Sequence, residues 1–160
     1  MIKSLVATSV AVLAVIGSAS VAHADESEPA PISIDLVRGD NIVYERRPDT
    51  WAAHGDFSFF VRLADAGSEN LDEATVFVSL PPEVEVTGFA GDRWECEDTE
   101  GGIDCYNPDL VVPGEEWPQL TVFGSVREAN GRIDSLDVYA KTGEYGAAHK
   151  GQWFRTINVG

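Results

Sequence analysis

The chain has 160 residues, with 27 Asp and Glu against 11 Lys and Arg, which gives a formal net charge of −16 at pH 7. A surface this acidic repels nucleic-acid phosphates and anionic lipids, because the basic side chains that bind them are scarce. We therefore expect neither a nucleic-acid partner nor insertion into a membrane.

The first 24 residues have the pattern of an export signal. Lys3 gives a positive start, residues 5–16 are almost all apolar, and Ala22-His23-Ala24 offers small residues for cleavage after Ala24. The apolar stretch is shorter than the roughly 20 residues that cross a bilayer, which argues against a membrane anchor. The sequence predicts a signal peptide over 1–24 and a secreted mature chain, extracellular or loosely associated with the cell envelope.

The mature chain is expected to form one domain. Residues 25–31 are rich in charge, serine and proline and predict a short disordered lead-in. Residues 32–160 suffice for a single hydrophobic core. Apolar residues alternate with a period of two, which indicates strands, and no helical stripe of useful length occurs. The alternating rows lie, in chain order, at 32–36, 57–63, 76–80, 84–86, 120–126, 136–140 and 153–159.

Turn residues separate these rows, among them Gly39-Asp40-Asn41, which is expected to be a plain hairpin turn. Short strands with turns about every ten residues are typical of antiparallel sandwiches and barrels. The fold prediction is therefore all-β, an immunoglobulin-like antiparallel β-sandwich of about 7–9 strands over 32–160.

The chain has two cysteines, Cys96 and Cys105. If 94–97 and 103–106 are neighbouring antiparallel strands, the two thiols face each other across a hairpin whose connection, 98–102, contains turn residues. The alternative is a thiol metal site, but two cysteines without a nearby histidine form a poor zinc shell. We expect a hairpin disulfide, which should stabilise the fold by roughly 2.5–3 kcal/mol.

A set of motifs recurs in a characteristic order along the middle of the chain. In order, these motifs are the strand 57–63, Asp65-Ala66-Gly67, Leu80-Pro81, Trp94-Glu95-Cys96, Cys105, Leu110, Gly114 and the strand 120–126. This order resembles the bacterial DUF11 repeat domain, an immunoglobulin-like module of exported surface proteins. The resemblance implies a non-catalytic spacer or binding module of the cell envelope. Because the sequence holds one copy of the pattern, we expect binding rather than spacing.

Groups that carry chemistry are scarce. His54 and His149 lie in polar segments flanked by glycine and are expected to be exposed loop residues, and the sequence lacks a Gly-x-Ser-x-Gly elbow. The acidic segments 65–73 and 97–104 could hold calcium, but neither has the spacing of an EF-hand loop. We predict no enzyme activity, no cofactor and no metal site, with a structural calcium as the minor alternative.

Aromatic side chains are the best binding candidates. Phe60, Phe77 and Phe123 lie opposite the main apolar row of their strands. They form either an exposed binding patch or, as we favour, a second core layer under a covering segment. Trp117, between two polar or turn-forming neighbours, is expected to be exposed, and Tyr106 follows the second cysteine.

The sequence thus predicts a secreted, non-enzymatic module that binds a protein or envelope component through loops or an outer sheet face. The alternative is a secreted inhibitor or a carrier of a small apolar ligand. In that case Trp117, Tyr106 and the phenylalanines would line one cleft.

Overall fold

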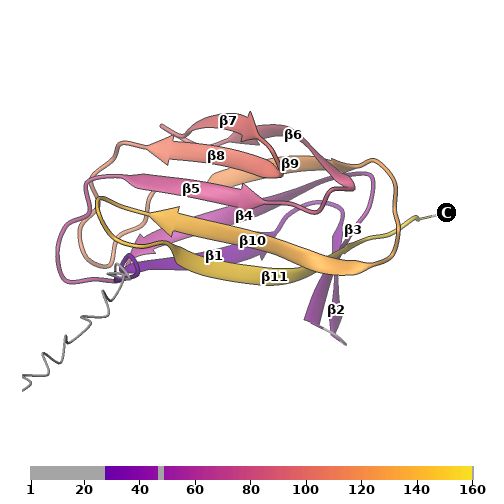
Figure 1. Cartoon of the computed structure of the whole chain (residues 1–160), viewed down its shortest axis with the longest axis horizontal. Helices are drawn as coiled ribbons and strands as arrows, with labels where there is room; N and C mark the ends of the chain where they lie inside the picture. The colour runs from indigo at the N-terminus through magenta and orange to yellow at the C-terminus, as the bar shows by residue number, and fades with distance from the viewer. Residues whose placement is uncertain (1–27, 47–48, 160) are drawn as a thin grey trace, which may run out of the picture.

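The computed structural model describes residues 28–46 and 49–159 as strands and connecting loops, and Figure 1 shows the whole chain. The predicted signal peptide over 1–24 and the first part of the lead-in, 25–27, lie outside the described residues. The strands are β1 (Ile32–Arg38), β2 (Ile42–Arg46), β3 (Asp49–Ala53), β4 (Asp56–Asp65), β5 (Ala74–Ser79), β6 (Val84–Ala90), β7 (Glu95–Thr99), β8 (Gly102–Asn107), β9 (Leu120–Val126), β10 (Ile133–Lys141) and β11 (Ala148–Thr156).

These strands form two sheets that pack face to face (Figure 1). The smaller sheet has the order β1-β4-β9-β6, and the larger has the order β2-β3-β11-β10-β5-β8-β7. Neighbouring strands are antiparallel, except that β11 runs parallel to β3. The predicted β-sandwich is confirmed. Across the described residues there is no helix long and apolar enough to cross a membrane.

The eleven strands exceed the 7–9 that the sequence predicts, because the hairpin of β2 and β3 has no alternating pattern. Thr50, Trp51, Ala52 and Ala53 are all buried, so this part of β3 is covered on both faces. A strand covered on both faces loses the period of two that reveals a half-buried strand.

The segment Gly39-Asp40-Asn41 carries the chain from one sheet to the other, so the prediction of a plain hairpin turn was wrong. β1 pairs with β4 in the smaller sheet, whereas β2 pairs with β3 in the larger one. The Gly39 amide donates to the Ser58 carbonyl at 2.9 Å and the Asp40 amide to Ser58 Oγ at 3.0 Å. A Cβ at Gly39 would lie 2.4 Å from Ser58 Oγ, so this crossing requires glycine.

The predicted disorder of the lead-in is wrong for residues 28–31. The Ala30 amide donates to the Gly146 carbonyl at 2.9 Å, and the Gly146 amide donates to the Glu28 carbonyl at 2.8 Å. Ala30 is also buried. These contacts with a distant loop fix a segment whose composition alone indicates disorder.

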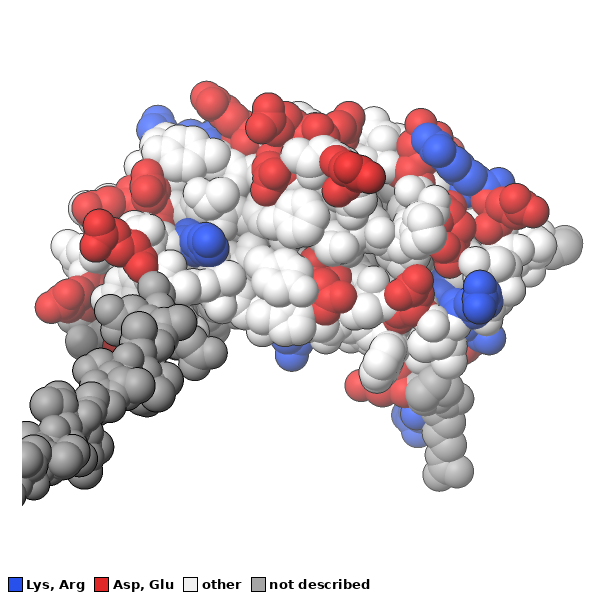
Figure 2. Space-filling model, viewed as in Figure 1, with Lys and Arg blue, Asp and Glu red and all other residues white. Residues whose placement is uncertain are grey.

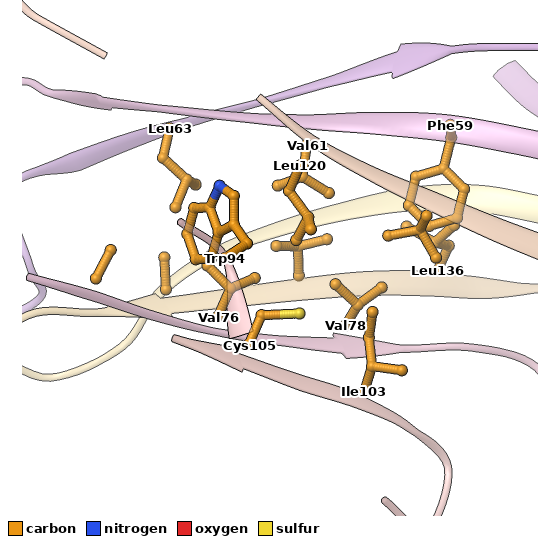
Figure 3. Packing of buried hydrophobic residues seen from close by; sticks show 14 of the residues in the cluster. Phe59, Val61, Leu63, Val76, Val78, Trp94, Ile103, Cys105, Leu120 and Leu136 are labelled. Carbon is orange, nitrogen blue, oxygen red and sulfur yellow. The ribbon is translucent and has the colours of Figure 1, made fainter. Parts of the chain in front are cut away.

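The hydrophobic core fills the space between the two sheets (Figure 3). Most of its members come from the predicted alternating rows and from the disulfide hairpin, and others come from β2, β3 and the loops. The predicted row at 153–159 is wrong, because Trp153 and Val159 are exposed and Phe154 takes the core face of β11 instead. The largest fully buried side chains include Phe59, Val61, Leu63, Leu120, Val76, Val78, Ile103 and Leu136. Because one face of each sheet is used for this packing, the alternate residues of the same strands point outward.

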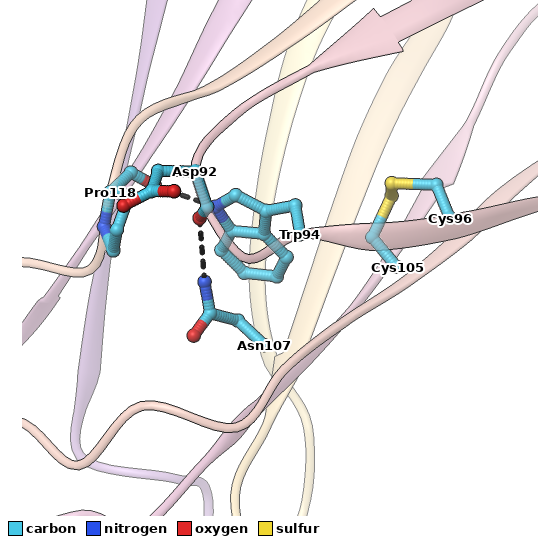
Figure 4. The surroundings of a disulfide bond; sticks show 6 residues. All are labelled: Asp92, Trp94, Cys96, Cys105, Asn107 and Pro118. Carbon is cyan, nitrogen blue, oxygen red and sulfur yellow. Dashed lines mark hydrogen bonds between the residues drawn. A yellow bond between two sulfur atoms is a disulfide. The ribbon is translucent and has the colours of Figure 1, made fainter.

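The predicted disulfide is confirmed: Cys96 of β7 lies opposite Cys105 of β8, and the two are bonded. The strands extend to Thr99 and Gly102, so the turn is shorter than predicted. Figure 4 shows the disulfide near Trp94, which directly precedes β7, and Asn107, the last residue of β8. The Trp94 indole donates to the Pro118 carbonyl at 2.6 Å, which fixes the hairpin to the loop before β9.

Candidate functional site: an aromatic and acidic sheet face

The structure places the five predicted binding residues in three separate regions. Trp117 is 2% exposed and packs in the core, so the expectation that it is exposed was wrong. Its indole donates to the Asp109 carbonyl at 2.9 Å, and its amide donates to the Leu63 carbonyl at 3.0 Å. Its neighbours in the sequence, Glu116 and Pro118, indicate a surface loop, but they do not determine which way the Trp117 side chain points.

The three phenylalanines lie on opposite outer surfaces of the sandwich. Phe60 and Phe123 face outward from the four-stranded sheet, and Phe77 faces outward from the seven-stranded sheet. Phe123 is 40% exposed and the other two are half-buried. The favoured interpretation, a second core layer, was therefore wrong, because no described layer covers these faces. The residues face outward as in the alternative, but they do not form one patch.

Phe77 belongs to a row of rings that crosses the outer face of the seven-stranded sheet. In register, Phe77 of β5 lies beside Tyr139 of β10, which lies beside His149 of β11. The ring centroids of Phe77 and Tyr139 are 6.3 Å apart, those of Tyr139 and His149 are 4.7 Å apart, and both pairs are stacked. Tyr106 of β8 faces the same way and lies opposite Thr75, two positions along β5 from Phe77. We call these four residues the aromatic strip.

His149 lies in a strand, so the expectation that it is a loop residue was wrong, although it is exposed as expected. Its Nε2 lies 2.7 Å from Oδ1 of Asp137 on the neighbouring strand. Gly151 is the residue directly opposite Asp137, and a Cβ there would lie 3.0 Å from that oxygen. Glycine at this position therefore leaves room for the contact between the carboxylate and the imidazole.

Carboxylates surround the aromatic strip. Figure 2 shows this face, with uncharged surface in the middle and many Asp and Glu residues along its upper edge. Glu95 lies opposite Tyr106, and Glu97 lies opposite Asp104, which itself lies opposite Phe77. The residues around the outer side of the β7–β8 hairpin line an open depression of about 630 Å³.

The negative charge acts on Tyr106 directly. Its hydroxyl donates to Glu73 Oε2 at 3.0 Å. This hydrogen bond, together with loss of hydration and the charges of Glu73 and Glu95, raises the pKa of Tyr106 above the ordinary value of 10.0. The neutral phenol is favoured because ionising it would place a further negative charge beside these carboxylates.

We expect Glu73→Gln to move the pKa of Tyr106 back toward 10.0, because the substitution removes the charged acceptor. Because folding raises this pKa, the contribution of Tyr106 to stability is complete below the unfolded value and is lost as the pH rises through the folded value. An NMR pH titration of the tyrosine ring carbons measures the midpoint, with Tyr106→Phe assigning the signal. An unchanged midpoint in Glu73→Gln would contradict the assignment of the cause.

The described residues contain no group of three or more His, Cys, Asp or Glu side chains that could hold a metal ion. Of the two acidic segments, 97–104 is almost entirely the β7–β8 hairpin. In the other segment, Asp65 is buried and its Oδ1 accepts the Gly67 amide at 2.8 Å, which closes a tight turn. Both segments thus have a structural role in the strands and turns they form.

Sequence reasoning named Phe77 and Tyr106 of the strip but missed Tyr139, Asp137 and His149. A signal for Tyr139 and Asp137 was present, because both alternate with the apolar row at 136–140, as Phe77 alternates with the apolar row of its own strand. His149 had no such signal, because the first half of β11, where it lies, is a polar segment that contains glycine. The arrangement as a whole is a flat, open face of rings and carboxylates, which suits contact with another surface.

No family model matches this chain, and no curated protein matches it in sequence. Solved structures match it in fold. A cohesin module from a Clostridium perfringens ATCC13124 family 33 glycoside hydrolase gives a TM-score of 0.52 at 9% identity, covering 80% of this chain and 99% of that one. The seventh ScaB type I cohesin from Pseudobacteroides cellulosolvens gives 0.50 at 10% identity, covering 79% and 94%.

A second kind of match is BcpA, the major pilin subunit of Bacillus cereus, with a TM-score of 0.53 at 8% identity. This match covers 78% of this chain and 40% of the pilin. At such identities the likeness concerns the fold alone. The chain therefore has an immunoglobulin-like β-sandwich fold of the kind found in cohesin modules and in this pilin.

Proposed function

We propose that the chain is an exported, non-enzymatic binding module that holds a protein partner against the outer face of its seven-stranded sheet. The observation that carries this proposal is the aromatic strip, four rings on four adjacent strands that no described layer covers. Aromatic side chains are enriched in protein interfaces, and the few residues that dominate the binding energy there are often tyrosine or tryptophan.

The strip is already ordered in the free protein. Its residues lie within strands, and the stacking of Tyr139 on both Phe77 and His149 restricts the three side chains. Binding to such a surface loses little side-chain entropy, which favours affinity. The open face supports binding rather than catalysis, because the His149–Asp137 pair lies on a sheet surface that does not shield reacting groups from water.

Two further observations agree with a role outside the cell. The disulfide fits an oxidising compartment, and the resemblance to the DUF11 domain implies an exported surface protein. The carrier alternative lacks support, because Trp117 is in the core while the other candidate rings lie on two opposite faces. A secreted inhibitor would be one case of the protein-binding module proposed here.

Site-specific photo-crosslinking in the source culture tests the proposal. A benzophenone amino acid replaces either Tyr139 on the strip or Phe123 on the opposite face, which are 38% and 40% exposed. We expect a discrete covalent adduct with a protein from the Tyr139 position and none from the Phe123 position. Phe77→Ser, added to the Tyr139 probe, should reduce the yield. Adducts from Phe123 alone, or equal yields from both, would refute the assignment of the face.

A further inference from the structure

We propose that the partner docks on the aromatic strip through an arginine-rich, positively charged segment of a protein. This inference rests on the proposed function and adds the chemistry of the partner. The observation that supports this inference is the placement of carboxylates beside the aromatic rings of this face.

Three of the four residues of the strip have a carboxylate beside them. Tyr106 bonds to Glu73 and lies opposite Glu95, Phe77 lies opposite Asp104, and His149 bonds to Asp137. These three pairs lie on neighbouring strands, so each of the three rings has a negative charge close beside it. A guanidinium group matches both parts, because it stacks on aromatic rings and forms two parallel hydrogen bonds with a carboxylate.

The charges on this face are strongly one-sided. Among the outward-facing residues of β5, β7, β8, β10 and β11, the acidic ones are Glu95, Glu97, Asp104 and Asp137. The basic ones are Lys141 and Arg155, and Arg155 is paired with Glu45 of β2. Potentials of this kind attract a partner of opposite charge and orient it on approach. A basic protein segment is therefore favoured over a neutral glycan.

Two of these carboxylates are held in an unfavourable arrangement. Glu97 and Asp104 lie directly opposite each other on adjacent strands, and like charges in that relation destabilise a sheet. The neighbouring register pair is the Cys96–Cys105 disulfide, which keeps the two strands together. A guanidinium group bound between the two carboxylates would remove this repulsion. Relief of the repulsion would therefore add to the free energy of binding a cationic partner.

The probe for this inference is a twelve-residue peptide of alternating arginine and threonine, with a glutamate–threonine peptide and chitohexaose as comparison ligands. Titration into isotopically labelled protein, followed by amide NMR shifts, gives both the affinity and the location. We expect shifts over β5, β8 and β10 with the arginine peptide alone, and affinity that weakens with added salt.

Matched variants separate this face from the net charge of the molecule. The isosteric pair Glu97→Gln with Asp104→Asn should weaken binding of the arginine peptide about tenfold. The control pair Asp35→Asn with Asp56→Asn removes two exposed charges from the opposite sheet and should leave binding nearly unchanged. Circular dichroism verifies that each variant is folded.

Each other outcome overturns the inference. Equal weakening by the two charge pairs means that the net charge alone attracts the peptide. Binding of chitohexaose on the strip, without the arginine peptide, makes the face a glycan platform. If the Tyr139 crosslink captures a partner but the arginine peptide does not bind, the binding function stands and the arginine-rich chemistry is wrong. Failure of the crosslink alone counts against the proposed function.

Discussion

Trp117→Ala is expected to lower the free energy of unfolding by about 4 kcal/mol, since truncation of a buried tryptophan costs about 3–5 kcal/mol. Trp117 is 2% exposed, and its indole donates to the Asp109 carbonyl at 2.9 Å. The alanine variant loses the buried apolar area, creates a cavity and leaves that carbonyl without its donor. Urea unfolding monitored by circular dichroism measures the loss.

Two control variants divide this effect into parts. Trp117→Phe keeps most of the ring but removes the hydrogen bond, so we expect it to cost about 1–2 kcal/mol. Trp153 is 56% exposed on the outer face of β11, so Trp153→Ala should change stability by about 0.5 kcal/mol at most. Equal losses from Trp117→Ala and Trp153→Ala would contradict the buried position of Trp117.

Loss of the Cys96–Cys105 bond is expected to lower the free energy of unfolding by about 3 kcal/mol, and the loss should concentrate in β7. This strand is at the edge of the seven-stranded sheet and pairs with β8 alone. Without the bond, repulsion between Glu97 and Asp104 opposes that pairing. Amide hydrogen exchange of the reduced protein should therefore show faster exchange in β7, with β10 and β4 still protected.

The salt dependence tests the electrostatic part of this explanation. Added salt screens exposed like charges, so it should recover part of the lost stability in Cys96→Ala with Cys105→Ala. Glu97→Gln in the same background should recover a similar part and make the protein less sensitive to salt. If neither salt nor Glu97→Gln restores stability, the disulfide does not act against carboxylate repulsion. Chemical reduction of the unmodified chain controls for the volume lost with the cysteine side chains.

Most strands could be predicted from the sequence, because each half-buried strand leaves a period of two. The rows that contain Phe59, Val78 and Leu136 all reach the core as predicted. The β2–β3 hairpin left no such pattern, since Trp51 and Ala52 are buried on opposite faces of β3. The lead-in was mistaken for a disordered segment because the Ala30–Gly146 contact joins distant parts of the chain.

The candidate site was only half predictable, for a related reason. Alternation shows that Phe60, Phe77 and Phe123 lie off the core row, but it does not show which sheet each strand joins. Pairing decides that: β5 lies next to β10, which sets Phe77 beside Tyr139, while β4 and β9 carry the other two phenylalanines to the opposite face. His149 reaches the strip only because β11 pairs with β10.

The sequence by itself determined the all-β class, the disulfide and the residues that alternate into the core, because these depend on spacing within short segments. Tertiary structure alone decided that the chain crosses between sheets at Gly39, that Trp117 points inward, and that Tyr106, Phe77, Tyr139 and His149 form one face. Each of these depends on which strands become neighbours. That choice depends on how apolar area is buried across the whole chain, and no local segment determines it.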